Sequence, residues 1–160
     1  MINSTYDYTG RKVDLEFLQT EAPPADSKAL TMTMTAQGMH RRVAGIQKLA
    51  QRYFLMFMTP KGSVKMAPSF GSDFMSAVQR GLLQSRTNVV QYFAFANMDV
   101  GQQLLAEDNL TVNAGLPDDE KYSKSYLLDY SIDTSASILY IKVLIESRAG
   151  TNYVFIVPIP

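Results

Sequence analysis

Two clusters of carboxylates are the first candidates for chemistry in this sequence: Glu107-Asp108 and Asp118-Asp119-Glu120. Paired carboxylates could serve as the acid and the base of a glycosidase. That chemistry needs one carboxylate to be desolvated, so that its pKa rises and it holds a proton near neutral pH. Both clusters lie in polar, loop-like sequence, which predicts that they are solvated.

A second candidate is the tetrapeptide Asp133-Thr134-Ser135-Ala136, which follows a strand-like run. Aspartic proteases hold their catalytic aspartate in a loop of this kind, and two loops must meet, so this chain would have to dimerise. Four residues between two alternating strands are also an ordinary hairpin loop, because Asp, Thr and Ser favour turns. A hydrolase, either a dimeric aspartic protease or a cell-wall glycosidase, stays open as the alternative function.

The remaining residue types give no sign of a metal or cofactor site. His40 is the only histidine and there is no cysteine, whereas a zinc site typically needs four ligands. The glycines form neither a dinucleotide-binding nor a P-loop pattern. We therefore expect no metal, no cofactor and no catalytic residues, and we expect His40 to lie on the surface at the start of a helix.

The overall charge argues against two classes of partner. The formal net charge is zero, whereas nucleic-acid binding depends on neutralising phosphates. No apolar run is long enough to cross a bilayer and the N-terminus has no signal-peptide pattern, so we expect assembly in the cytoplasm. The charge is split, because residues 1–86 hold 11 basic and 6 acidic side chains and residues 87–160 hold 4 and 9. The two halves could cancel within the fold or mediate head-to-tail packing.

The chain predicts two parts, an N-terminal arm over residues 1–35 and an α+β domain over residues 36–160. In the arm, Arg11–Gln19 alternates as a half-buried strand does and Pro23-Pro24 then breaks the pattern. From Ala36 the period becomes helical. The bases Arg41, Lys48 and Arg52 fall on the polar side of that helix, either solvated or docked on an acidic partner.

The rest of the domain reads as strands, two helices and a C-terminal β-meander. The run 53–58 is continuously apolar and predicts a buried strand, which Ser63–Ala67 could pair with across a turn. Helices are expected from Ser72 or Asp73, carrying Phe74, Met75, Val78 and Leu82, and from about Thr87 to Leu105, with Val89, Val90, Phe93, Ala96, Val100 and Leu104 inward. A polar loop, with a short strand at 110–112, then precedes three antiparallel strands at 126–133, 137–146 and 152–159, the last kept at an edge by its prolines.

One loop is specified unusually closely, and it carries a family resemblance. Its positions are a Thr-x-Lys-Gly-Ser turn followed by a Pro-x-Phe-Gly turn that opens a helix: Thr59, Lys61, Gly62, Ser63, Pro68, Phe70 and Gly71. With the order of elements around it, this stretch resembles the sheath-initiator and baseplate-wedge family of contractile phage tails, which includes lysozyme-like phage baseplate proteins and components of type VI secretion baseplates. The resemblance covers about residues 37–160. The physical role expected of the loop is to orient a helix against a sheet.

The resemblance implies a structural protein of the virion tail baseplate. It implies six copies in a ring around the tail tube, contacts with tube and other wedge proteins, and strand addition by arms of the tail sheath protein. The sequence offers an apolar edge strand as the sheath-binding surface: Asn152, Tyr153, Val154, Phe155, Ile156 and Val157. A Glu-Pro-Arg motif that is common in the family is absent from residues 101–113, and the arm could replace that wedge contact.

Overall fold

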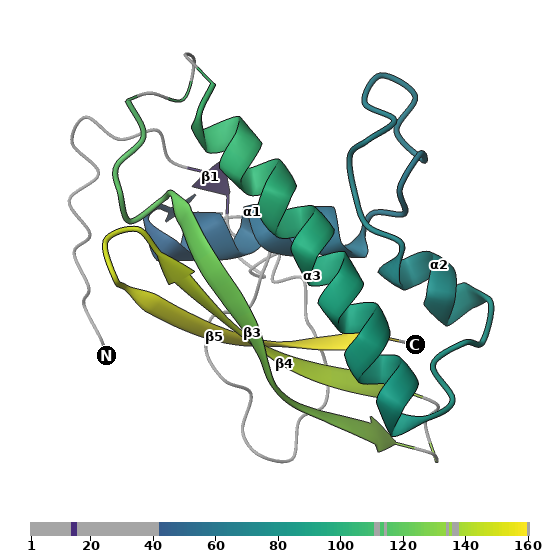
Figure 1. Ribbon diagram of the computed structural model, residues 1–160. Coiled ribbons are helices and arrows are strands. Elements are labelled where there is room, and N and C mark those ends of the chain that lie inside the picture. The colour runs from purple at the N-terminus through teal and green to yellow at the C-terminus, as the bar shows by residue number, and fades with distance from the viewer. Residues whose placement is uncertain are drawn as a thin grey trace, which may run out of the picture.

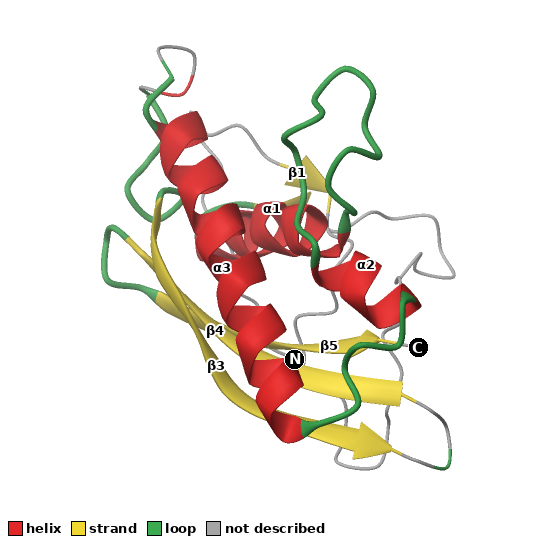
Figure 2. Ribbon diagram, turned by 45° about the vertical axis from the view of Figure 1, so that its right-hand side comes forward, coloured by secondary structure: helices red, strands yellow, loops and turns green. Residues whose placement is uncertain are grey.

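The computed structural model describes residues 14–15, 42–110, 113, 115–133, 135 and 138–159. Helices pack on one face of a three-stranded antiparallel sheet (Figures 1 and 2), which confirms the α+β class and the C-terminal meander. In chain order the elements are β1 (Asp14–Leu15), β2 (Arg42–Val43), α1 (Ile46–Met58), α2 (Phe74–Gln79), α3 (Arg86–Asp108), β3 (Tyr122–Asp133), β4 (Ile138–Ser147) and β5 (Asn152–Ile159).

The sheet has the order β3-β4-β5, so β4 is central and the other two strands form its edges. Along β4 the side chains alternate, and its odd-numbered residues from Leu139 to Ile145 are buried against the helices. This alternation is the period expected of a sheet that covers a core on one side. Pro158 lies in β5 opposite Tyr140, which confirms the expected edge position because a proline cannot donate to a further ladder bond.

Helix α1 lies over β4 and β5, and α3 runs along β3 (Figure 1). The inward face of α3 comprises Val89, Phe93, Ala96, Val100 and Leu104, as expected, but Val90 is 45% exposed. Ser85 caps the helix, because its side chain accepts a hydrogen bond from the Asn88 N–H at 3.2 Å. Gly101 lets α3 approach the sheet closely, since a Cβ at this position would lie 3.0 Å from the Tyr122 hydroxyl.

The expected strand at residues 53–58 is wrong, because these residues form the second half of α1. A short apolar run does not distinguish a buried strand from a buried helical turn. Here Leu49, Tyr53 and Phe57 are all fully buried at a spacing of four residues, so the run continues the helical face that begins upstream. The helix ends where Thr59 donates its side-chain hydroxyl to the Leu55 carbonyl and Pro60 follows.

Two further boundaries differ from those expected. Helix α1 begins at Ile46 rather than near Ala36, because Arg42–Val43 pairs as a strand with Asp14–Leu15. Helix α2 ends at Gln79, so Leu82 lies beyond it, after the left-handed Gly81. The β1 residues agree with the strand expected in Arg11–Gln19. The remaining arm residues, together with Met39, His40 and Arg41, lie outside the described residues.

Candidate partner-binding site

The loop between α1 and α2 closes on itself at a tight neck, formed by Thr59 to Lys61 and by Gly71 and Ser72. The Ser72 N–H donates to the Thr59 carbonyl at 2.9 Å, and the Lys61 N–H donates to the Ser72 carbonyl at 3.0 Å. Gly71 has φ 101°, and a Cβ on it would lie 2.2 Å from the Thr59 carbonyl oxygen. Only glycine fits this position, both because of its backbone conformation and because of the missing side chain.

Helix α3 and the end of α1 hold the neck in place. The Gln103 side chain bonds both backbone groups of Gly71, accepting from its N–H at 3.0 Å and donating to its carbonyl at 2.7 Å. Lys61 pairs with Asp99 at 3.0 Å, and the Ser72 hydroxyl donates to the Phe57 carbonyl. Phe70 packs, half-buried, against the core. The loop therefore orients α2 chiefly against α1 and α3, whereas the sequence predicted that it would orient a helix against the sheet.

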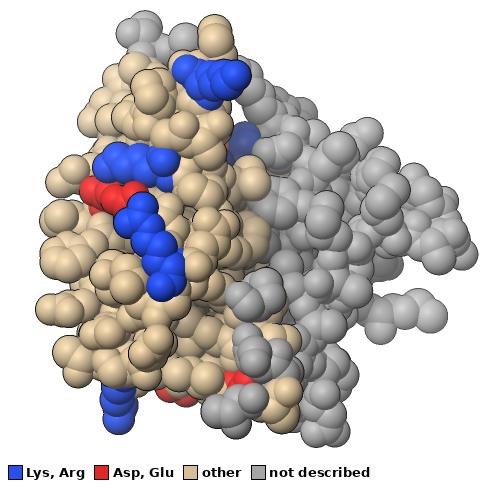
Figure 3. Space-filling view, turned by 90° about the vertical axis from the view of Figure 1, so that its right-hand side faces the viewer, with Lys and Arg blue, Asp and Glu red and all other residues tan. Residues whose placement is uncertain are grey.

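The tip of this loop, Gly62 to Pro68, differs from the expected hairpin. Ser63–Ala67 forms consecutive turns and not a strand, so Pro68 ends no strand. Val64 and Met66 alternate with polar residues as in a strand, but neither is buried, and Met66 is 96% exposed. Gly62 does have the expected positive φ, at 82°. The face that includes this loop and α2 is largely uncharged, with scattered basic side chains, some of them beside an acidic one (Figure 3).

The carboxylate clusters are not solvated as a whole, because Glu120 and Asp108 are buried. Glu120 accepts a hydrogen bond from the Gly45 N–H at the start of α1 and forms an ion pair with Lys48 at 2.8 Å. A carboxylate at a helix N-terminus is stabilised by the helix dipole as well as by its partner base. Loop-like sequence failed as a guide here because the partners of Glu120 lie more than 70 residues away.

Arg52 joins the second cluster to the same network. It contacts Glu107 and Asp108 at 3.0 Å each, and it donates to the Glu120 carbonyl at 3.1 Å. Asp108 in turn accepts from the Tyr122 N–H at 2.7 Å, where β3 begins. Lys48 and Arg52 are thus neither solvated nor presented to an outside partner, since their side chains are 12% and 18% exposed. The basic first half and the acidic second half of the chain neutralise each other here.

A second buried polar cluster links α1, α3 and β3. Asn97 accepts hydrogen bonds from the hydroxyls of Tyr53, at 2.6 Å, and Ser125, at 2.5 Å. The Tyr122 hydroxyl lies 2.6 Å from that of Ser125. Burial raises the pKa of both Tyr53 and Tyr122 above the usual value of 10.0, and the hydrogen bond to Ser125 only partly offsets this. The cluster keeps both phenols neutral and fastens β3 to the helices.

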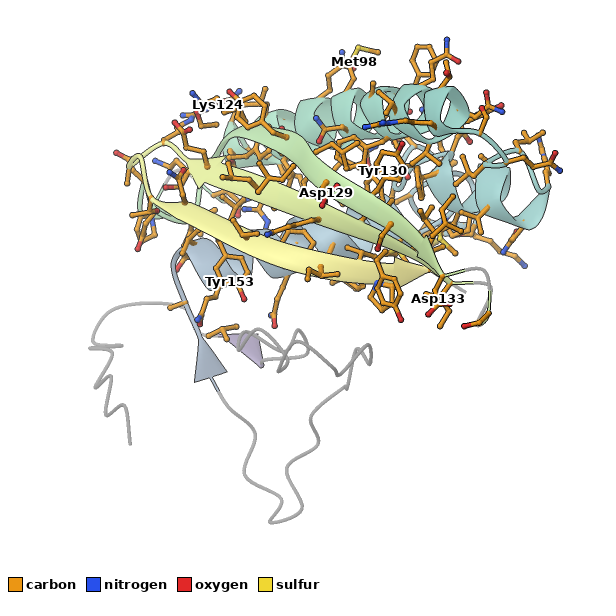
Figure 4. All side chains as sticks on the ribbon, turned by 90° about the horizontal axis from the view of Figure 1, so that it is seen from below. Met98, Lys124, Asp129, Tyr130, Asp133 and Tyr153 are labelled. Carbon is orange, nitrogen blue, oxygen red and sulfur yellow. The ribbon has the colours of Figure 1, made fainter. Side chains whose placement is uncertain are left out.

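The Asp-Thr-Ser-Ala segment connects β3 to β4, and its described residues form a turn. Asp133 ends β3, and its carboxylate accepts from the N–H and the hydroxyl of Ser135 at 3.0 and 2.6 Å. Thr134 and Ala136 lie outside the described residues. An aspartate that closes its own turn in this way is the hairpin arrangement that the sequence also allowed. Figure 4 shows Asp133 at the far end of β3.

The predicted sheath-binding residues of β5 separate into two sets. Tyr153, Phe155 and Val157 face the helices, and Phe155 is 6% exposed against the aromatic rings of Tyr53 and Phe54. Asn152, Val154 and Ile156 lie on the other side, which we call the outer face of the sheet. Val154 and Ile156 are 41% and 42% exposed there. Only this second set has side chains accessible to a partner.

The phase of the β4–β5 ladder determines which backbone groups of β5 face away from β4. The Ser147 N–H donates to the Thr151 carbonyl at 2.9 Å, and these two residues are opposite each other at the hairpin. Hydrogen-bonded pairs alternate along an antiparallel ladder, so the odd-numbered residues of β5 direct their backbone groups toward β4. The N–H and C=O groups of Asn152, Val154 and Ile156 therefore point to the outer edge. Among the described strands, none pairs with β5 on that side.

Comparison with known proteins found no match, whether with protein-family models, with curated proteins or with solved structures. In the described part of the chain, no group of three or more His, Cys, Asp or Glu residues could hold a metal ion. Over the same residues, no helix is both long and apolar enough to cross a membrane.

Proposed function

We propose that this chain is a structural baseplate subunit of a contractile phage tail, which surrounds the tail tube and nucleates the sheath by accepting a strand at β5. Six copies in a ring and contacts with other wedge proteins are part of the same proposal. The observation that carries it is the edge of β5, where Asn152, Val154 and Ile156 combine outward backbone groups with exposed side chains.

The chemistry of this edge favours a strand as the partner. Asn152, Val154 and Ile156 are every second residue of β5, and their N–H and C=O groups point outward. Their spacing is that of an extended strand, so the backbone of a partner strand can bond to them. The strand Asn152–Ile159 contains no charged residue, whereas an edge left bare in solution is commonly protected by charges or a bulge. An uncharged edge strand of this kind can fix the register of a partner strand and suits being covered permanently in an assembly. The loop residues Thr59 to Gly71, which resemble the sheath-initiator family, supply the identity of that assembly, together with the helices and the C-terminal meander that follow them. The strand expected just before the loop is instead the end of α1.

The test is to place charges on the β5 edge without changing the net charge. In the double variant Val154→Lys, Ile156→Glu, the new glutamate lies opposite Lys142, so the pair is favourable within the fold. An incoming strand, however, would have to place its own side chains beside both charges, and charges on an edge strand disfavour such pairing. In cells that assemble particles from this variant alone, we expect at least a tenfold drop in sheathed tails counted by electron microscopy, with the subunit still present in baseplates by mass spectrometry.

The matched control puts the same two charges on the other edge strand, at the exposed positions Ser123→Glu and Ser131→Lys. This control should leave sheathing near the wild-type level. Normal sheaths on particles that contain the β5 double variant would overturn the proposal. Unfolding midpoints of the two purified variants within a few degrees of each other show that any difference in sheathing is not a difference in folding.

A further inference from the structure

Helix α3 lacks the charged outer face of an ordinary surface helix. From Thr87 to Ala106 every exposed residue of this helix is uncharged, while the opposite side packs on the core. The outer face comprises Thr87, Val90, Gln91, Ala94, Phe95, Met98, Gln102, Leu105 and Ala106. Phe95 and Met98 are 61% and 55% exposed, and Met98 projects away from the sheet (Figure 4). The face is uncharged but mixed, since Thr87, Gln91 and Gln102 are polar, and its exposed apolar side chains are the part that a partner would cover.

The spacing of these residues fits a second helix rather than a flat surface. Positions 91, 94, 98, 102 and 105 recur at intervals of three and four residues, which is the seam through which two helices pack. The seam runs from Gln91 to Leu105 and is therefore about 22 Å long at 1.5 Å per residue. The partner surface must also be uncharged, because a buried charge without a partner is unfavourable.

The seam is complementary to itself when a second copy runs antiparallel across it, with a twofold axis at Met98. Ala94 then lies opposite Gln102 of the other copy, and Val90 lies opposite Ala106, so each small residue meets a longer one. A parallel pair would instead place Ala94 opposite itself and leave a gap. The antiparallel arrangement also aligns the two helix dipoles favourably.

Charge is also compatible with a twofold contact at this place. Identical residues meet at a twofold axis, so any charge there would repel its copy. Asp99, next to Met98 in sequence, is already paired with Lys61 at 3.0 Å. The neutral seam therefore meets its copy without like charges facing each other.

We propose that α3 is a homodimer interface, in which two copies of this chain pack antiparallel through the outer faces of their α3 helices. This inference concerns the free subunit and does not depend on the β5 edge; a ring of six equivalent copies is built from head-to-tail contacts, so the twofold contact would have to open on assembly. One helix face from each copy is at the small end of specific interfaces, which bury about 1,200 Å² or more in total. The expected dimer is therefore weak, with a dissociation constant on the order of micromolar.

The absence of cysteine from the chain allows a direct test by disulfide crosslinking. In the full-length protein, Met98→Cys should form a disulfide-linked dimer under mild oxidation at least ten times faster than Met66→Cys. Met66 is the control because it is 96% exposed and lies on the loop tip, so it reports random collision. A mixture of Ala94→Cys and Gln102→Cys should give the mixed dimer, and Ala94→Cys alone should not.

Two outcomes would overturn the homodimer. One is a Met98→Cys rate equal to that of Met66→Cys, and the other is wild-type protein that stays monomeric by analytical ultracentrifugation at about 100 μM. Efficient crosslinking of Ala94→Cys with itself would replace the antiparallel arrangement by a parallel one. The Met98→Glu variant should be monomeric at concentrations where the wild type is dimeric. The β5 double variant Val154→Lys, Ile156→Glu should dimerise like the wild type, which separates this inference from the proposed function.

Discussion

The two edge strands of the sheet differ in how they meet solvent. The register of β3 is interrupted twice, between Tyr122 and Lys124 and between Leu127 and Asp129. Lys124 forms an ion pair with Glu146, and that hydrogen bond raises the pKa of Lys124. Bulges and charges are the devices by which proteins keep an edge from pairing with another chain. The register of β5 is continuous from Asn152 to Ile159 without a bulge or a charge, and Pro158, near its end, is the one residue that blocks further pairing.

The same strands also differ in how the helices hold them. β3 is fastened by polar contacts, because Asp108 accepts from the Tyr122 N–H and Asn97 bonds to Ser125. β5 is held by aromatic packing, with Phe155 next to the rings of Tyr53 and Phe54. The strand with the bare edge thus has an apolar anchor. The comparison teaches that the fold protects one edge of its sheet and leaves the other suited to a partner.

The largest expected effect comes from removing the apolar anchor of β5. Phe155→Ala should lower the free energy of unfolding by about 3–5 kcal/mol, because a large ring is lost from a buried site. Val154→Ala, on the outer face of the same strand, should cost less than about 1 kcal/mol. Urea unfolding of both variants measures the difference. Similar losses for the two would mean that β5 is not held through its inward face.

The next effect tests the polar anchor at the start of β3. Glu120→Gln leaves Lys48 without its carboxylate in a site where both side chains are mostly buried, and we expect a loss of about 3 kcal/mol. The double variant Lys48→Met, Glu120→Gln should recover part of it, because no unpaired charge remains. Chemical denaturation of the single and double variants gives both values. A double variant less stable than Glu120→Gln would contradict an ion-pair anchor.

The smallest effect is a dependence on alkaline pH that arises in the tyrosine cluster joining β3 to α1. Burial raises the pKa of Tyr53 and Tyr122 in the folded state, so the unfolded chain loses these protons first, above about pH 10. The contribution of these two phenols to stability should therefore be constant below pH 10 and fall as the pH rises further, by up to about 1.4 kcal/mol per pH unit for each phenol. Between pH 9 and 11, Tyr53→Phe, Tyr122→Phe should lose less stability than wild type by roughly 1–2 kcal/mol. If both proteins lost the same unfolding free energy, the alkaline sensitivity would come from groups other than Tyr53 and Tyr122.

The sheet was predictable because its signal is local. Strands such as β4 and β5 alternate between buried and exposed residues over their whole length, and short connections imply antiparallel neighbours. Helix α3 was also found, within a few residues at each end. For residues 152–157, the sequence did not separate the side chains that face the core from those that face outward. That choice depends on which face of the sheet the helices cover.

The polar anchors were missed because their partners are distant in sequence. Glu120 and Asp108 bond to α1 residues that lie 56 to 75 positions away. One local signal was present for Asp108, because it lies four residues after Leu104 and so continues the buried stripe of α3. Likewise, Lys48 and Arg52 are one helical turn apart, so they face the same side of α1.

The closed neck of the α1–α2 loop has a practical consequence for locating this subunit. Since Thr59 and Ser72 are already joined by hydrogen bonds, a peptide tag spliced in after Met66 lengthens a segment whose two ends are fixed. Lengthening such a loop costs little, because closure entropy grows only slowly with the number of residues. The protruding tip is therefore a suitable place for a fluorophore or antibody tag that would mark each copy in an intact particle while leaving both β5 and α3 unmodified.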